Sequence, residues 1–280
     1  MSVRIIVDST TDLTPAIKKR LTVVPLTIHF GEEEYVDGIT LSHQAFYEKL
    51  VEGDVLPTTS QPTPAAFEKV YRKVQAAGDS AVVLTVSSKL SGTYQSATIA
   101  ADGYDNVYIV DSQSVAIGLG ILAELALRLA DEGLDAETIA QRLIQERENV
   151  RLVAMLDTLE YLKRGGRISK TVAFAGGLLS IKPVISIREG VIEMLGKARG
   201  SRQGNNLLVK EIQAAGGVDF DKPLLLGYTG LSDTLLQKYM VDSAFLWQHH
   251  VADLPYTIIG SVVGTHAGPG AVAVAFFKKD

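Results

Sequence analysis

The sequence has 280 residues, 46% of them hydrophobic, which is enough for one large or two ordinary domains with a sizeable core. It contains no cysteine, which excludes thiol nucleophiles, thiolate metal sites and disulfides and fits a reducing cytoplasm. The net charge of −5 argues against a broad nucleic-acid-binding face. No signal-peptide pattern and no membrane-length apolar stretch is visible, so we expect a cytoplasmic protein without a transmembrane segment.

In the first half of the chain, short β-branched runs alternate with helical patterns. Threonine followed by proline, at Thr14-Pro15 and Thr63-Pro64, is typical of a helix start. The alternation predicts parallel strands in a layered α/β fold. The expected strands are residues 3–7, 23–30, 81–86 and 107–110, and the expected longer helices are residues 42–52, 64–75, 92–101, 115–132 and 136–148.

The pattern changes near residue 150, and the second half favours a mixed sheet with helices. Two β-rich runs joined by Arg188-Glu-Gly190 predict a hairpin. We therefore expect an N-terminal parallel-sheet α/β domain at residues 1–150 and a C-terminal mixed-sheet α/β domain at residues 151–280. The expected strands are residues 152–156, 184–187, 191–195, 224–228, 257–263 and 271–277, and the expected helices are residues 158–163, 201–214 and 233–247.

Two hydroxyl-rich segments are candidates for an anion site. The segment TVSSKLSGTY, residues 85–94, follows a buried strand and leads into a helix, and residues 58–63 lead into the helix that begins at Pro64. Backbone N–H groups and hydroxyls at such helix starts can bind an anion at the carboxyl edge of a parallel sheet. The same hydroxyls can also serve only as helix caps. Neither segment is a nucleophile elbow or a P-loop.

Other polar motifs have a structural and a functional interpretation. Asp8 and Asp12 follow the first strand, where turn and capping roles are favoured over a metal-assisted phosphatase site. His266 is expected in a glycine-rich loop, residues 264–270, between two strands. Arg164 and Arg167 flank two glycines and can bind an anion, cap a helix or form a partner surface.

Taken together and in order, these motifs resemble the DegV family. The matching segments are residues 8–13, 59–62, 90–94, 110–112 with 118–120, 163–169, 181–183 and 265–271. The resemblance implies a cytoplasmic protein that holds one long-chain fatty acid, such as palmitate or oleate, between its two α/β domains. It also implies a non-enzymatic subunit that presents the fatty-acid carboxylate to a separate ATP-dependent fatty acid kinase, with no cofactor and no metal.

The resemblance also implies roles for particular residues. Thr59 and Ser91 correspond to the hydroxyls that hold the carboxylate, and His266 and Arg199 to polar residues near the same head group, with Arg202 competing with Arg199. Residues 118–126 and 173–179 are candidates for lining the tail tunnel and equally for core helices.

Two alternatives to a fatty-acid carrier stay open at this point. One is a hydrolase or phosphotransferase on a small anionic substrate, with a triad of Ser91, His266 and Asp111. The other is an interaction protein that uses residues 164–170.

Overall fold

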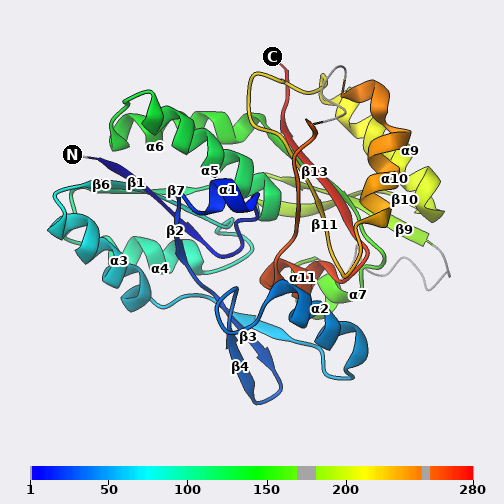
Figure 1. Cartoon of the computed structure of the whole chain (residues 1–280), viewed down its shortest axis with the longest axis horizontal. Helices are drawn as coiled ribbons and strands as arrows, with labels where there is room; N and C mark the ends of the chain where they lie inside the picture. Colours follow the sequence, from blue (N-terminus) through cyan, green and yellow to red (C-terminus); the bar gives the residue numbers. More distant parts are fainter. Residues whose placement is uncertain (1, 169–180, 248–252, 280) are drawn as a thin grey trace.

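Three β-sheets and the helices around them form the described part of the protein, which is residues 2–168, 181–247 and 253–279 of the computed structural model (Figure 1). Within those ranges, no helix is both long and apolar enough to cross a membrane. The α/β fold class, with a parallel N-terminal sheet and a mixed C-terminal sheet, is confirmed.

The N-terminal sheet has four parallel strands in the order β2-β1-β6-β7. Successive residues of β1 point to opposite faces, so Ile6 packs against one pair of helices while Ile5 and Val7 join the core on the other face. The elements are β1 (Val3–Asp8), α1 (Pro15–Lys18), β2 (Thr22–Val24), α3 (Pro64–Ala76), β6 (Ser80–Thr85), α4 (Thr93–Ala100), β7 (Val107–Asp111), α5 (Ala116–Asp131) and α6 (Ala136–Glu146).

A small antiparallel sheet, in the order β4-β3-β5, projects from the first half below the main sheet (Figure 1). Phe46 and Tyr47 of α2 pack on Ile28 and Phe30 of this sheet and form a separate aromatic core. Its elements are β3 (Thr27–Phe30), β4 (Glu33–Val36), α2 (His43–Glu52) and β5 (Thr58–Ser60).

The C-terminal sheet has six strands in the order β10-β9-β8-β13-β11-β12, antiparallel except for β11 with β12. Helices α9 and α10 cover one face, where Leu208 and Tyr239 pack on Val153 and Met155. Its elements are η1 (Arg147–Asn149), β8 (Val150–Met155), α7 (Glu160–Arg164), β9 (Ile181–Arg188), β10 (Val191–Arg199), α9 (Gly200–Ala214), β11 (Leu225–Tyr228), α10 (Thr234–Asp242), η2 (Ala244–Leu246), β12 (Tyr256–Ile258), α11 (Ser261–Ala267) and β13 (Val272–Phe277).

Helix α5 lies between the four-stranded and the six-stranded sheet. Its residues Ile117, Leu119 and Leu122 are fully buried, and one continuous core contains Val82 of β6 and Ala273 of β13. The six-stranded sheet begins at Val150, close to the predicted boundary, but this shared core joins the two halves. That residues 1–150 and 151–280 are two domains stays a prediction.

Three sequence predictions of secondary structure were wrong in part. The strand predicted at residues 257–263 ends at Ile258, and residues 261–267 form helix α11. The β-branched residues of this run favour a strand, but tertiary contacts favour the helix. Val262 packs in the aromatic core. Gly264 lies so close to Tyr47 that a Cβ at Gly264 would be 2.6 Å from the Tyr47 hydroxyl. The run 23–30 is two strands in different sheets, and the helix predicted at 233–247 ends at Asp242.

Candidate functional site

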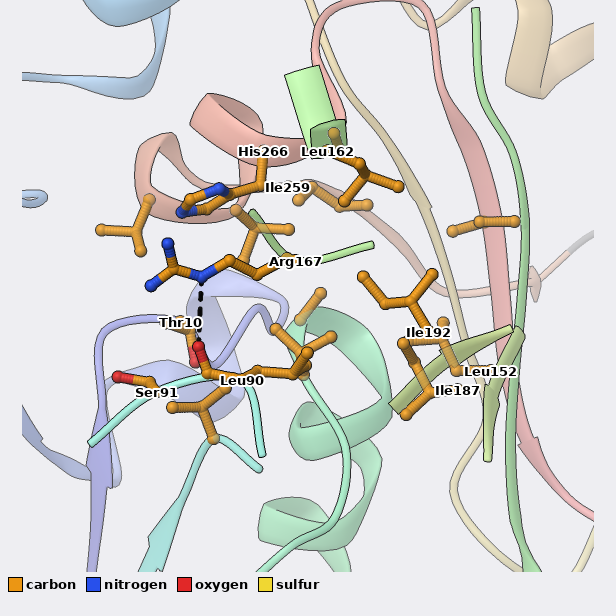
Figure 2. Close-up of a pocket in the computed structure, with 18 of the residues that line it drawn as sticks. Thr10, Leu90, Ser91, Leu152, Leu162, Arg167, Ile187, Ile192, Ile259 and His266 are labelled. Carbon is orange, nitrogen blue, oxygen red and sulfur yellow. Dashed lines mark hydrogen bonds between the residues drawn. The ribbon is translucent and has the colours of Figure 1, made fainter. Parts of the chain in front are cut away.

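A cavity of about 370 Å³ lies where the carboxyl edge of the four-stranded sheet meets β5, α11 and the inner face of the six-stranded sheet. Figure 2 shows Ser91, Arg167 and His266 at one end, and Leu152 and Ile192 toward the other. This is the edge at which open α/β sheets bind ligands, as the sequence predicted.

The polar end brings together four side chains from separate segments. Thr59 Oγ1 lies 3.1 Å from His266 Nε2, and Ser91 Oγ lies 2.9 Å from Thr93 Oγ1. Arg167 donates from Nε to the Leu90 carbonyl at 3.2 Å. Thr59, Ser91, Arg167 and His266 are each only partly buried.

The remaining wall of the cavity is almost entirely aliphatic. It draws on β8, β9, β10 and β13 and on the residues that flank α5 and α11. Small side chains such as Ala154, Ala271 and Ala273 leave space beside larger ones. Its apolar members are Leu26, Val86, Leu90, Val115, Ala116, Leu152, Ala154, Leu156, Leu162, Ile185, Ile187, Ile192, Ile259, Val262, Val263, Ala267, Ala271 and Ala273.

Buried hydrogen bonds hold the loop that carries Ser91. The Val86 N–H donates to Asp8 Oδ2 at 2.6 Å, and the Ser91 N–H donates to the Ser87 carbonyl at 3.1 Å. Ser87 Oγ donates to the Gly190 carbonyl at 2.7 Å, and Ser88 Oγ donates to Asp111. Ser87 and Ser88 therefore have the turn-forming roles expected from the sequence, and Ser91 is left facing the cavity.

Gln61 connects the two hydroxyl segments. Its Nε2 donates to Ser96 Oγ on α4 at 3.1 Å, and its side chain lies over Gly92. A Cβ at Gly92 would be 2.1 Å from Gln61 Oε1, so a larger residue there would displace the Gln61 side chain from this position. Thr59 lies on the short strand β5 and not in a loop as expected, and its pairing with Ile28 sets its position.

His266 projects from α11, so its prediction in a glycine-rich loop was wrong. Burial, helped by the nearby cation of Arg167, lowers its pKa to about 4, which keeps the ring neutral at pH 7. Its Nδ1 is buried without a hydrogen-bond partner among the described residues, and it faces Gly165, where a Cβ would be 2.2 Å away.

The two arginines predicted as a partner surface lie in different environments. Arg164 is exposed and pairs with Glu160 at 2.8 Å on the outside of α7. Arg167 lines the cavity, and its Nη1 donates to the Gly165 carbonyl at 2.5 Å. In the described residues its Nη2 has no hydrogen bond, and its place in the cavity agrees with the anion-binding interpretation of Arg167 more than with a partner surface. Residues 169 and 170 of the motif lie outside the described residues.

Arg199 and Arg202 do not line the cavity. Both are exposed near the start of α9, and the Arg199 N–H donates to Gln203 Oε1 at 2.8 Å. The role near the head group that the resemblance implied for Arg199 stays a prediction, and the arginine that lines the cavity is Arg167.

The members of the possible triad are held apart by other partners. Asp111 binds Ser88 and the Gln113 N–H, at 3.1 Å for the latter, while His266 contacts Thr59. Ser91 contacts Thr93 and has no hydrogen bond to His266 in the described structure. The arrangement lacks the nucleophile–base contact of a hydrolase.

The aspartates after β1 have structural roles, as favoured from the sequence. Asp8 accepts from the Thr10 N–H at 2.9 Å and Thr10 Oγ1 at 2.6 Å, and Asp12 accepts from the Gly260 N–H at 2.9 Å. Burial raises the pKa of both carboxyls, that of Asp12 to about 7. Among the described residues, no three acidic or histidine side chains converge as metal ligands.

The two segments considered for the tail tunnel have different outcomes. Residues 118–126 form the buried middle of α5, and only the preceding Val115 and Ala116 reach the cavity. Residues 173–179 lie outside the described residues.

Comparisons with other proteins agree over the whole chain. The sequence model of the DegV family, described as an uncharacterised protein family, matches residues 2–279. A DegV domain-containing protein from Deinococcus radiodurans is 36% identical over 282 residues, which cover 98% of each chain.

Solved structures of related proteins also superpose on this chain over its whole length. A DegV family protein from Thermus thermophilus, described for its fatty acid binding, is 32% identical with a TM-score of 0.88 over 100% of both chains. A stearic-acid-binding protein from Eubacterium ventriosum is 26% identical with a TM-score of 0.84, covering 100% of this chain and 99% of that one. The chain described here belongs to the DegV family.

Proposed function

We propose that this protein binds one long-chain fatty acid and presents its carboxylate to a separate ATP-dependent kinase. The observation that carries the proposal is a cavity with polar side chains gathered at one end and an otherwise mainly aliphatic wall. The resemblance and the fatty-acid-binding relatives support the same ligand class.

The acyl chain supplies most of the affinity. Each buried methylene contributes roughly 0.8 kcal/mol, so about a dozen methylenes contribute on the order of 10 kcal/mol before the costs of association. Leu152, Ile187 and Ile192 enclose the far end, where Figure 2 shows no polar group among the labelled residues. The preference is therefore for a long apolar tail over a short or branched polar one.

The head group is held by Arg167 and the hydroxyls of Thr59 and Ser91. A guanidinium and hydroxyls offer a carboxylate charge-assisted hydrogen bonds worth roughly 1.5–3 kcal/mol each. His266 is close enough to Thr59 to orient its hydroxyl, since Nε2 lies 3.1 Å from Oγ1. Together these groups fix which end of the ligand faces the opening.

Presentation to a kinase follows from where the carboxylate lies. In acyl-phosphate formation a carboxylate oxygen attacks the γ-phosphorus of ATP and ADP leaves, so the carboxylate must be reachable by a second active site. The partly exposed polar end meets that need, and the sequence contains no P-loop of its own.

Organic extraction followed by mass spectrometry tests the ligand. We expect a stoichiometric C14–C18 fatty acid from the purified protein, or binding of palmitate and oleate to the stripped protein by calorimetry. Recovery of no lipid, together with no binding of either acid, would contradict the proposal. Esterase or phosphatase turnover lost in Ser91→Ala would favour the hydrolase or phosphotransferase instead.

A kinase assay tests the second part separately. Loaded protein, ATP and a bacterial fatty acid kinase should yield ADP and acyl phosphate, while protein or kinase alone should not. Fatty acid binding without any such turnover would leave a carrier and remove the kinase role.

A further inference from the structure

A second cavity, of about 420 Å³, lies on the other side of the wall that closes the fatty-acid cavity. It is enclosed by the loop after β7, by η1, by the ends of β8 and β9 and by α9. Leu152, Ser186 and Ile187 line both cavities. The second cavity is predominantly polar, and the proposed function gives it no role.

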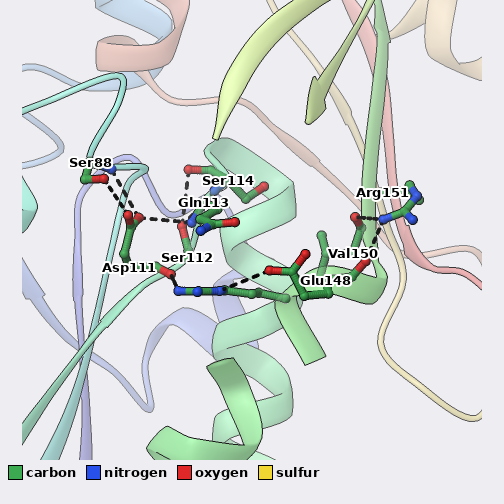
Figure 3. Close-up of polar contacts among 9 residues, drawn as sticks. Ser88, Asp111, Ser112, Gln113, Ser114, Glu148, Val150 and Arg151 are labelled. Atoms are coloured by element: carbon green, nitrogen blue, oxygen red, sulfur yellow. Dashed lines mark hydrogen bonds and ion pairs between the residues drawn. The ribbon is translucent and has the colours of Figure 1, made fainter. Parts of the chain in front are cut away.

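Three arginines line this second cavity, and one of them has no acidic partner. Arg147 donates from Nη1 to the Asp111 carbonyl at 2.8 Å and lies 3.5 Å from Glu148, and Arg188 lies 3.7 Å from the exposed Glu193. Arg151 donates only to the backbone carbonyls of Glu148 and Val150, each at 2.9 Å (Figure 3). No carboxylate of the described residues is within ion-pair distance of Arg151.

Two of these cations come from neighbouring strands. The paired part of β8 and β9 ends with Val153 opposite Ser186, and Arg151 and Arg188 each lie two residues beyond that pair and line the same cavity. Like charges close together on neighbouring strands are destabilising. Burial and the neighbouring Arg188 cation lower the pKa of Arg151, and the nearby Glu148 carboxylate offsets this only in part.

A buried hydroxyl without a partner faces the same region. Ser186 is 5% exposed, lies on the arginine face of β9, and its Oγ has no hydrogen-bond partner among the described residues. Arg147 Nε makes no hydrogen bond but lies 3.5 Å from Glu148 Oε1, so its charge is already paired. Buried hydroxyls are normally hydrogen-bonded, so Ser186 is suited to a ligand.

The loop that closes the cavity is held in an unusual conformation. Gln113 has φ +51, and the Asp111 carboxylate fixes the loop by accepting from the N–H groups of Ser88 and Gln113, each at 3.1 Å (Figure 3). Left-handed backbone at a non-glycine residue is strained and persists where the surroundings enforce it. The cavity wall is therefore a built structure and not a mobile surface loop.

Acidic groups also line the cavity and limit what it can bind. Glu148 is paired with Arg147, Glu189 is exposed in the hairpin turn, and Glu211 comes from α9. Three arginines and three glutamates line the cavity, but Arg151 has no ion pair among the described residues.

We propose that this second cavity binds the oxyanion group of a small molecule, a phosphate or a carboxylate, between Arg151 and Arg188 with Ser186 as a further donor. Because both cavities share Leu152 and Ile187, occupancy of one changes the affinity of the other, a coupling that rests on the proposed fatty acid binding.

Anion titrations of the full, lipid-stripped chain test the site without reference to fatty acids. Inorganic phosphate and citrate are each titrated at constant ionic strength and followed by backbone amide NMR. We expect saturable shifts at Gln113, Ser186 and Arg188 for one or both probes, and which probe binds tighter separates phosphate from carboxylate recognition. No saturable shift with either probe would overturn the proposal.

Variants then identify the residues. Arg151→Gln should weaken binding at least tenfold, whereas Glu211→Gln should tighten it severalfold because a competing carboxylate is lost. Arg72→Gln, which breaks an exposed pair with Glu68 on α3, should change nothing. If Arg151→Gln and Arg72→Gln change anion affinity equally, the anions respond only to the overall surface charge, and the site is rejected.

The coupling is measured last, by titrating palmitate with and without saturating anion. If the anion changes palmitate affinity in wild type but not in Arg151→Gln, the result supports coupling of the two cavities through their shared wall. An unchanged palmitate affinity would reject the coupling, and failure of palmitate to bind at all would count against the proposed function and not against the anion site.

Discussion

The two cavities of this protein share a wall and are chemically opposite. On one side of β8 and β9, Leu152 and Ile187 face mainly aliphatic side chains, and Thr59, Ser91, Arg167 and His266 gather at the other end of the cavity. On the other side, Arg151 and Arg188 line a polar cavity together with three glutamates. The difference shows how the alternation of side chains along a strand lets one pair of strands serve two chemistries.

A charge placed in the apolar cavity should weaken palmitate binding the most. Ile192 lines its far end, and Ile192→Asp places a carboxylate where the fatty-acid tail would lie. We expect palmitate affinity to fall about a hundredfold or more, because burying an unpaired charge is costly. Calorimetric titration with palmitate measures this loss.

The neighbouring residue provides the control for that change. Val191 is 38% exposed and does not line the cavity, so Val191→Asp adds the same charge one position away on the opposite side of the strand. It should leave palmitate affinity within twofold. Equal losses in both variants would mean that the tail does not reach this end.

Removing the Arg167 cation at the polar end should cause the next largest loss of palmitate affinity. Arg167→Gln removes a charge-assisted hydrogen bond to the carboxylate, which corresponds to about a 10- to 100-fold weaker binding of palmitate. Arg164→Gln, three residues away and exposed, is the matched control. If the methyl ester of palmitate binds wild type as tightly as the acid does, Arg167 has no carboxylate to hold.

The histidine at the polar end should make stability depend on pH. The pKa of His266 is lowered to about 4 in the folded protein, so between pH 6.5 and 4 the unfolded chain binds a proton that the native ring does not. Native stability therefore falls as the pH drops through this range. The free energy of unfolding, measured with urea, should be lower at pH 4.5 than at pH 6.5. This decrease should be smaller in His266→Gln than in wild type by about 1–2 kcal/mol.

Comparison with the variant separates His266 from His43, whose pKa burial also lowers to about 4 and which is present in both proteins. A bound carboxylate favours the protonated ring, so palmitate should reduce the wild-type fall. An identical pH dependence of wild type and His266→Gln would show that His266 titrates normally.

Removing the Thr59 or the Ser91 hydroxyl should cause the smallest loss of palmitate affinity. Thr59→Ala and Ser91→Ala each remove one hydrogen bond to the carboxylate, and we expect palmitate binding to weaken about 5- to 10-fold with little change in thermal stability. Thr63→Ala is the contrasting variant, because Thr63 Oγ1 accepts from the Ala66 N–H at the start of α3. It should cost about 1 kcal/mol of stability and no affinity. The reverse pattern would identify Thr59 and Ser91 as caps.

Much of the fold could be predicted because local pattern and burial agree. Ile5, Ile6 and Val7 of β1 and the proline-started helix α3 have the features that their surroundings demand. Helix α11 could not be predicted, because Gly264 against Tyr47 and the Gly260 N–H on Asp12 are contacts between residues more than 200 positions apart.

The same limit applies to the candidate site. Ser91, Thr59 and His266 were identified from motifs, and the structure brings them to one end of one cavity. For Arg167 the sequence left anion binding, helix capping and a partner surface open, because it cannot show whether a side chain after α7 turns inward, and the bond to the Leu90 carbonyl is what holds it there. The polar second cavity left no sequence signal, since Arg151 and Arg188 come from different strands and line one cavity only in the folded protein.

The position of α5 has a consequence for attempts to take this protein apart. Ile117, Leu119 and Leu122 are fully covered from both sides, by the four-stranded and the six-stranded sheet. A fragment cut after residue 150 would carry α5 with one of its sides open to water, which favours aggregation over independent folding. We expect the two halves to be recovered in native form only when they are co-expressed, because neither half alone covers both sides of α5.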